Sequence, residues 1–309
     1  MAFAVAEYEV PVAEPYRLDL TVSVLRRLST NLVDVLTPEG VYLRVLGDAH
    51  RPMLVRVSSR QRGTLCVTLE GERRAHRRAL KTVHRMLGTD RTLQEFDLGA
   101  ARIPWLRPLA LRMRGVKPPR YPTLWEACVN AIVFQQVSIH AASAILRRYV
   151  LTLGSPFELH DGPTLHAFPN AEVTLRANDD VLRAAGLSTN KIATLRRVAE
   201  ALVTETLDEP MLDECSSVEA AGLLRSIKGI GPWTATVILL RGLGRLEVFP
   251  MNDSGVAGSL TFAGGSLPEI ESVLDVLGSQ RGMLYYHLLL ARLEARGELG
   301  PQEPLRTSD

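Results

Sequence analysis

Residues 223–253 read LLRSIKGIGPWTATVILLRGLGRLEVFPMND, and this stretch decides how the second half of the chain folds. Ser216 and Glu219, which stand just before it, predict a capping box that opens a first helix. Pro232 suits the first turn of a second helix, because the N–H that proline lacks has no intrahelical partner there. The sequence therefore predicts a helical hairpin over residues 217–243.

The turn of this hairpin is rich in glycine. Gly229 and Gly231 flank Ile230, and residues without a side chain let a ligand come close to the backbone. The first N–H groups of the following helix have no helical partner, so they are expected to face an anion. A nucleic-acid phosphate fits such a turn, and the alternative is a plain tight connection between two helices.

One carboxylate stands out after the hairpin. Asp253 follows Pro250-Met251-Asn252 and precedes Ser254-Gly255-Val256, so it is expected where a loop enters a new helix. Aspartate is a good N-cap residue, and this structural role is compatible with a chemical one.

Further segments agree with the hairpin in order and type: WE at 125–126, AIVFQQVS at 131–138, GLS at 186–188 with Lys191, and Arg281 in a late helix. Together with Asp253, they make residues 120–295 resemble the helix-hairpin-helix (HhH-GPD) base-excision DNA glycosylases. The AlkA-type 3-methyladenine DNA glycosylase II is the nearest resemblance. It implies a two-lobed, all-α glycosylase domain.

The resemblance also assigns roles to individual residues. It implies that Asp253 is catalytic and that Gln136 is the wedge that fills the gap left by an extruded base. The remaining DNA contacts would be Gly229, Ile230, Gly231, Thr234 and Arg281; the base pocket would hold Trp125, Trp233, Val237 and Gln280; and the carbonyls of Arg225, Ile227 and Ile230 would hold a structural Na⁺ or K⁺.

Some of these residues have ordinary structural readings. Gln135 and Gln136 could be helix-end amides bonded to the backbone, and Trp125 would be a core anchor in most helical proteins. Val237 and Gln280 stand where the family's best-known member has aromatic residues, so we expect a roomier base pocket with a different choice of lesions.

The resemblance implies hydrolysis of the N-glycosidic bond of alkylated bases in damaged double-stranded DNA. Related enzymes that also cut the strand carry a lysine two residues after the second hairpin glycine, where this chain has Trp233. We therefore expect no lyase activity, no cofactor for catalysis and no iron–sulfur cluster. The alternatives are a glycosylase for oxidised or mismatched bases, and a DNA-structure-binding protein without catalysis.

Composition bounds the class of protein. The 309 residues are 46% hydrophobic and 23% charged, as in ordinary globular proteins. Three cysteines far apart favour reduced thiols, and no apolar run approaches the length of a membrane span. We expect a monomeric protein of the cytoplasm, associated with the nucleoid.

Charge is divided unevenly, although the net charge is only +2. Residues 1–120 carry 21 Lys and Arg against 12 Asp and Glu, whereas the remainder carries 15 against 22. The hairpin lies in the acidic part, so a DNA contact there would depend on local donors and a few cations.

The predicted fold class is α+β. Short alternating runs at residues 41–46, 53–57 and 64–69 predict a small antiparallel sheet, on which a basic helix within residues 73–85 packs. The pattern-breaking stretch RGVKPPR at 114–120 predicts a boundary between an N-terminal domain, 1–115, and the helical domain, 120–300. Residues 154–169 are expected to be a loop between helices.

Overall fold

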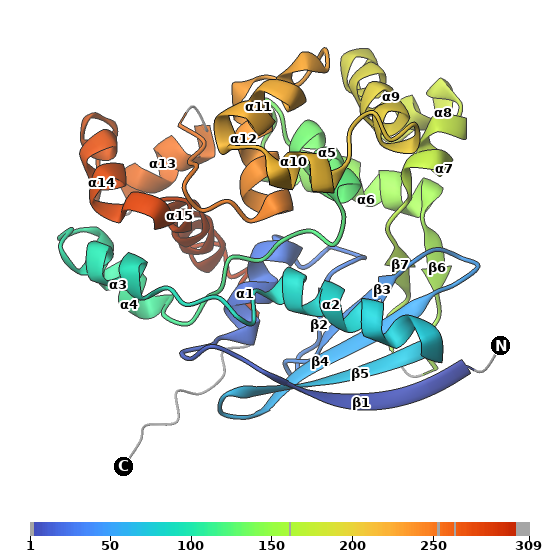
Figure 1. Ribbon diagram of the computed structural model, residues 1–309, viewed down its shortest axis with the longest axis horizontal. Helices are drawn as coiled ribbons and strands as arrows, with labels where there is room; N and C mark the ends of the chain where they lie inside the picture. Colours follow the sequence, from blue (N-terminus) through green and yellow to red (C-terminus); the bar gives the residue numbers. More distant parts are fainter. Residues whose placement is uncertain (1–2, 161, 252–253, 263, 301–309) are drawn as a thin grey trace.

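The computed structural model describes residues 3–160, 162–251, 254–262 and 264–300. It has an antiparallel sheet at one side and a larger helical body above it (Figure 1). The fold class predicted from the sequence, α+β, is confirmed. No described helix combines the length and the apolar character needed to cross a membrane.

The sheet has five strands in the order β1-β5-β4-β3-β2, and every neighbouring pair is antiparallel. The three predicted strands are present as β3 (Tyr42–Leu46), β4 (Met53–Gln61) and β5 (Thr64–Glu72). The structure adds the long edge strand β1 (Phe3–Pro11) and the short β2 (Val35–Leu36). The basic helix, α2 (His76–Leu87), lies on this sheet as predicted (Figure 1).

The apolar spacing of the second half predicts helices at residues 125–134, 138–151, 181–184, 191–203, 218–227, 233–243, 270–277 and 283–295, and the structure contains them with small changes in their ends. They are α5 (Leu124–Val133), α6 (Ile139–Leu153), α8 (Asp179–Ala184), α9 (Thr189–Val203), α11 (Ser217–Ser226), α12 (Pro232–Ile238), α14 (Ile270–Leu277) and α15 (Met283–Glu294). The helical pattern expected up to residue 243 continues past α12 as a π-helical turn, Leu239–Leu243.

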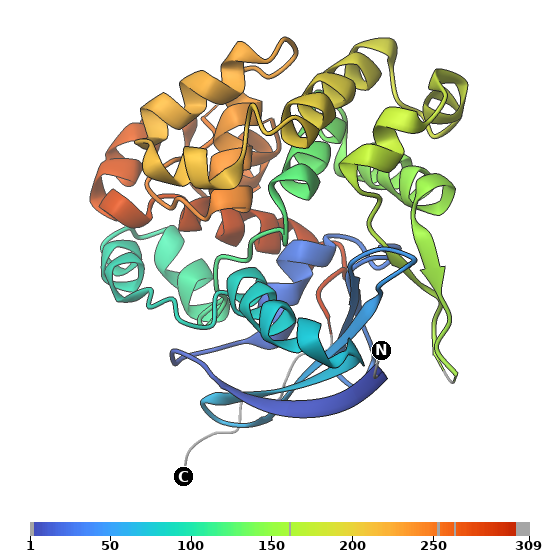
Figure 2. The same ribbon diagram turned by 45° about the vertical axis from the view of Figure 1, so that its right-hand side comes forward.

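Several shorter elements were not predicted. They are α1 (Leu18–Arg26), α3 (Gln94–Ala101), α4 (Leu106–Arg112), α7 (Ala171–Arg176), α10 (Glu209–Glu214) and the single 3-10 turns Arg73–Ala75, Leu267–Glu269 and Gly278–Gln280. Helix α13 (Ser254–Phe262) begins directly after Asp253, where the sequence predicted that a loop enters a new helix. The segment expected as a loop contains a hairpin, β6 (Ser155–Phe157) and β7 (Leu165–Ala167), that descends beside the sheet (Figure 2). Leu165 and Ala167 pack with β3 and β4 residues, so the hairpin closes the end of the sheet.

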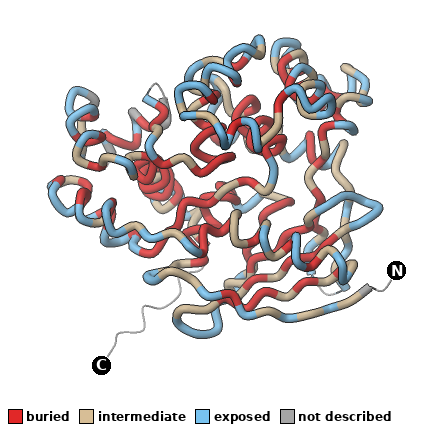
Figure 3. The backbone as a smooth tube through the Cα atoms, viewed as in Figure 1, coloured by how far each residue is buried: buried red, intermediate tan, exposed pale blue. Residues whose placement is uncertain are grey.

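The cores do not divide at the predicted boundary. Helices α3 and α4 precede residue 115, yet Phe96, Leu106 and Leu109 belong to one core with α13, α14 and α15. Helix α1 is buried along its whole length and contributes to both the sheet core and this helical core. Figure 3 shows buried segments in the sheet, in the helices above it and between the two.

A buried ionic cluster joins the sheet to the helical body. Arg44 of β3 donates to Asp34 at 2.6 Å and to Glu126 of α5 at 2.5 Å, and all three side chains are buried. Tyr42 also donates to Asp34. Because a buried charge is stable only when it is paired, this cluster fixes how α5 sits on the sheet.

Candidate functional site

The predicted helical hairpin is present and is formed by α11 and α12. Ser216 and Glu219 make the predicted capping box, in which each side chain accepts from the other residue's backbone N–H. Pro232 is the first residue of α12 and Gly231 is its N-cap. The turn between the helices therefore ends at a helix N-terminus, as an anion-binding turn requires.

The two glycines of the turn differ in backbone conformation and in the space around them. Gly229 has a φ of +105°, and a Cβ built there would lie 1.9 Å from the hydroxyl oxygen of Thr194 in α9. Gly231 has an ordinary φ of −89°, and a Cβ there would meet nothing within 4 Å. Gly229 is thus needed for the fold of the turn, whereas Gly231 leaves open space in front of α12.

Gln135 fixes the hairpin to the turn between α5 and α6. Its Nε2 donates to the carbonyl of Gly229 at 3.1 Å and to the hydroxyl of Thr234 at 2.7 Å. The reading of Gln135 as a helix-end amide bonded to backbone is therefore confirmed. Thr234 is buried, so its hydroxyl serves this contact.

Gln136, the predicted wedge, occupies an exposed position at the same turn. Its φ is +56°, a left-handed conformation that is uncommon for a residue with a side chain. It lines the same hollow as Gly229 and Gly231. Its wedge role stays a prediction.

That hollow is a cleft of about 1320 Å³. Its walls come from the α5–α6 turn, the beginning of α9, the hairpin and α15. Five basic residues line it: Arg27, Lys191, Arg197, Lys228 and Arg292. Among the described lining residues there is no Asp or Glu, so this part of the cleft has a positive potential and suits a polyanion.

Two of these cations also stabilise the turns. Lys191 donates to the carbonyls of Val133 and Gln135 at 2.8 and 3.1 Å, where α5 ends, and burial lowers its pKa. Arg197 donates to the carbonyl of Lys228 at 3.1 Å. Lys191 belongs to a motif noted in the sequence, whereas nothing in the sequence singled out Arg197.

Aromatic side chains also face the cleft. Trp233 and Tyr285 line it together with Phe134 of the α5–α6 turn. Trp233 was predicted at the base pocket, and the structure places it on this wall. Phe134 and Tyr285 were missed, because aromatic residues within apolar helices are more often core residues.

Five predicted contacts are absent from the cleft lining: Trp125, Val237, Ile230, Gln280 and Arg281. Trp125 is 7% exposed and its indole N–H donates to the carbonyl of Pro169 at 2.8 Å, so it is the core anchor of the alternative reading. Val237 is 2% exposed and packs in the same core. Neither residue lines the cleft, and their roles as pocket walls stay predictions.

Gln280 and Arg281 serve a turn instead. The Oε1 atom of Gln280 accepts from the N–H of Phe96 at 3.1 Å, which satisfies the start of α3. Arg281 donates to the carbonyl of Gly278 at 2.9 Å. Neither is among the residues lining the cleft, and their predicted roles in the pocket and in DNA contact stay predictions.

Ile230 requires a further correction. Its side chain is 5% exposed, and its N–H donates to the carbonyl of Ile227 at 3.0 Å. The N–H therefore closes the turn and is not free for a phosphate.

The predicted cation ligands lie around the same turn. The carbonyl of Ile227 accepts one hydrogen bond, and a carbonyl oxygen has a second lone pair. Arg225 lies in the last turn of α11, where the helix dipole is negative and favours a cation. The monovalent ion that these carbonyls were predicted to hold stays a prediction.

Asp253, the predicted catalytic residue, lies outside the described residues. Helix α13 follows it immediately, and Val256 of that helix lines the cleft. A residue that lines the cleft therefore stands only three positions after Asp253 in the sequence.

Comparisons with known proteins agree with this arrangement. Residues 129–269 match the family model described as "HhH-GPD superfamily base excision DNA repair protein". The chain is 28% identical over 220 residues to the "Probable bifunctional transcriptional activator/DNA repair enzyme AlkA" of Mycobacterium tuberculosis, covering 71% of this chain and 43% of that protein. It is 26% identical over 181 residues to a DNA-3-methyladenine glycosylase of Bacillus subtilis, covering 59% of each.

A solved structure covers more of the chain. The 3-methyladenine DNA-glycosylase from Archaeoglobus fulgidus superposes with a TM-score of 0.78 at 26% identity, covering 93% of this chain and 99% of that one. The similarity therefore includes the N-terminal sheet as well as the hairpin.

Proposed function

We propose, since residues 129–269 belong to the HhH-GPD superfamily of base excision DNA repair proteins, that this protein is a DNA glycosylase. Its substrates are alkylated bases in double-stranded DNA, of the 3-methyladenine type, and it breaks their N-glycosidic bond. The observation that carries this proposal is the hairpin turn at Gly229–Gly231 on the wall of a cleft whose lining includes the cations Arg197, Lys228 and Arg292.

The cleft supplies the means to bind DNA. Lys228 and Arg197 are exposed beside the hairpin turn, and cations that neutralise phosphates give affinity without reading sequence. The N-terminus of α12 adds backbone donors for a phosphate. The volume of the cleft leaves room for a nucleotide rotated out of the stack, which a base-removing enzyme needs.

Asp253 is proposed to perform the chemistry. Its ionised carboxylate stabilises the positive charge that develops on the deoxyribose as the bond breaks. A carboxylate about 4 Å from that charge, at an effective dielectric constant near 20, contributes about 4 kcal/mol. This corresponds to about a thousandfold in rate.

One carboxylate suffices for a readily leaving base. Ordinary glycoside hydrolysis needs a second, protonated carboxyl for a poor leaving group. A base alkylated on a ring nitrogen is already cationic and departs without this help. Trp233 stands at the position of the lyase lysine, so water is proposed to be the nucleophile and the enzyme to be monofunctional.

Gln136 is proposed to occupy the space left by the rotated base, because it is exposed at the tip of the α5–α6 turn. A Na⁺ or K⁺ ion held by the carbonyls of Arg225, Ile227 and Ile230 is proposed to stiffen the hairpin. No cofactor takes part in the proposed chemistry.

The test is release of free base from duplex DNA treated with a methylating agent. Wild type should release methylated bases, and Asp253→Asn should lower the rate about a thousandfold while DNA binding remains. Asp275→Asn, an exposed carboxylate on α14, is the matched control and should retain full activity.

Each other result contradicts part of the proposal. Full turnover by Asp253→Asn would refute its catalytic role. DNA binding without release of any base by wild type would indicate a structure-binding protein, and release of oxidised or mismatched bases alone would indicate the other glycosylase class.

A further inference from the structure

Arg27 is held in an unusual conformation at the end of α1. Its φ is +59° and its ψ is −75°, which is unfavourable for a residue with a side chain. The residue is only 5% exposed. Such strain persists where the surrounding structure fixes the residue, and it frequently marks functional sites.

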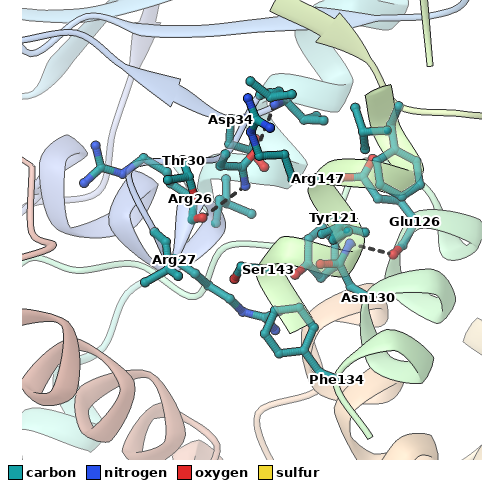
Figure 4. A pocket seen from close by; sticks show the side chains of 18 residues that line it. Arg26, Arg27, Thr30, Asp34, Tyr121, Glu126, Asn130, Phe134, Ser143 and Arg147 are labelled. Carbon is teal, nitrogen blue, oxygen red and sulfur yellow. Dashed lines mark hydrogen bonds between the residues drawn. The ribbon is translucent and has the colours of Figure 1, made fainter. Parts of the chain in front are cut away.

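The guanidinium of Arg27 lies between two hollows. Its central carbon stands 3.6 Å from the centroid of the Phe134 ring. Figure 4 shows the Arg27 side chain reaching this ring. Arg27 and Phe134 line both the cleft and a small cavity behind it, of about 30 Å³. They therefore form the wall that separates the cleft from the interior.

The hydrogen-bonding capacity of this guanidinium is not filled. Tyr285 lines the cleft together with it. Its Nη1 atom is buried and has no hydrogen-bond partner among the described residues. Burial lowers the pKa of Arg27, as expected for a cation removed from water.

The carboxylates near Arg27 are already paired with another arginine. Asp34 and Glu126 line the small cavity, but both are paired with Arg44. A buried donor without an acceptor is costly, so a ligand that supplies an acceptor gains affinity there.

We infer, on the basis of the proposed glycosylase activity, that Arg27 is a specificity-determining residue that donates a hydrogen bond to a carbonyl oxygen on the extruded base. A guanidinium has only donors, so an exocyclic amino group in the same place would oppose donor to donor. A base is the appropriate occupant, because Arg27 is too deeply buried to meet a phosphate of the DNA backbone.

Contact with Nη1 requires a small movement. Since this atom is covered by protein, the guanidinium must slide across Phe134 to meet the base. The movement exchanges part of a cation–π contact for a hydrogen bond from a charged donor, which is among the stronger hydrogen bonds in proteins.

The inference favours bases with a carbonyl edge. Among methylated purines, 7-methylguanine carries O6 where 3-methyladenine carries an amino group. A site with a buried donor discriminates strongly against a partner that leaves the donor unpaired. Arg27 should therefore raise the rate on 7-methylguanine relative to 3-methyladenine.

The experiment measures single-turnover release of both bases from the same methylated duplex DNA. Arg27→Met, which keeps length and removes the donors, should lower the 7-methylguanine rate about tenfold to a hundredfold more than the 3-methyladenine rate. Arg27→Lys, which retains charge and a donor, should restore part of the ratio. Arg26 lines only the small cavity, so Arg26→Met should leave the ratio of the two rates unchanged.

The ratio distinguishes the possible outcomes. An equal fall in both rates would show that Arg27 is structural, and unchanged rates would show that it does not touch the base; either overturns the inference. If Arg27→Met does not fold by circular dichroism, the shift of the ratio in Arg27→Lys decides. Release of neither base by wild type would overturn the proposed function, and this inference with it.

Discussion

Two sets of cationic residues in this protein have opposite surroundings. Arg44 is enclosed at the junction of the sheet and α5, and both of its carboxylate partners are buried with it. Arg197 and Lys228 stand open at the cleft, whose described lining contains no carboxylate. The charge of Arg44 is neutralised by carboxylates of the protein, whereas the charges of Arg197 and Lys228 are available to an anionic ligand.

The difference shows where a charge serves stability and where it serves binding. A buried pair contributes little net stability, but removal of one partner leaves an uncompensated charge. Exposed cations cost little to remove, yet each can neutralise a phosphate. Substitutions in the two regions should therefore affect different measurements.

The largest effect on stability is expected at the junction. Arg44→Met leaves Asp34 and Glu126 buried without a cation and should lower the free energy of unfolding by about 3–5 kcal/mol. Arg56→Met on β4 breaks a pair of 3.8 Å between partly exposed side chains and should cost less than about 1 kcal/mol. Urea denaturation checks both, and equal small losses would show that the buried cluster is not special.

His287, a buried basic side chain, should make a contribution to stability that depends on pH. Burial lowers the pKa of His287 in α15 to about 4 from its ordinary 6.5, so the folded protein keeps this ring neutral. The unfolded chain binds the proton first as the pH falls from 6.5 to about 4. The stability associated with His287 is thus complete above pH 6.5 and is lost over that interval.

The loss should reach about 3 kcal/mol at the acid end. Urea denaturation across this pH range should show a smaller decrease in His287→Leu than in wild type. His50→Leu, at an exposed position, should follow wild type. Identical pH profiles for wild type and His287→Leu would contradict the assignment of a neutral buried ring.

The hairpin turn should separate structural from binding roles within the cleft itself. Gly229→Ala forces a Cβ onto Thr194 at a positive φ, and should cost about 1–3 kcal/mol of stability. Gly231→Ala meets open space and should leave stability nearly unchanged, although its methyl group would stand in front of α12. Thermal unfolding compares the two, and equal losses would refute the distinction between these glycines.

The smallest effect on stability is expected at the exposed cations. Lys228→Gln should change the free energy of unfolding by no more than about 0.5 kcal/mol. Lys81→Gln on α2, equally exposed and away from the cleft, is its matched control. A large loss of stability in Lys228→Gln would show that this lysine has a structural role, as Arg44 has.

Sequence reasoning was most successful where the signals were local. The capping box, the proline at the start of α12 and the turn glycines each depend on neighbouring residues, and the hairpin follows from them. The strands β3, β4 and β5 were found by alternation, whereas β1 was missed, because its pairing partner β5 lies far away in the chain. The β6–β7 hairpin was missed although it is local, because each of its strands has only three residues and shows no clear alternation.

The lining of the cleft was harder to predict. Trp125 and Val237 match family positions, but contacts with distant residues place them in the core. Arg27 and Phe134 are brought together across more than a hundred residues, and no local pattern marks either one. The position of a side chain in a cleft is a property of tertiary packing, which spacing alone does not encode.

The central claim, that the cleft cations bind DNA, is tested most directly by the salt dependence of duplex binding. The triple variant Arg197→Gln, Lys228→Gln and Arg292→Gln should bind more weakly than wild type at low salt. The slope of log affinity against log salt concentration should be less steep by about 3, or about 1 for each lost phosphate contact. An affinity and a slope identical to those of wild type would contradict the claim.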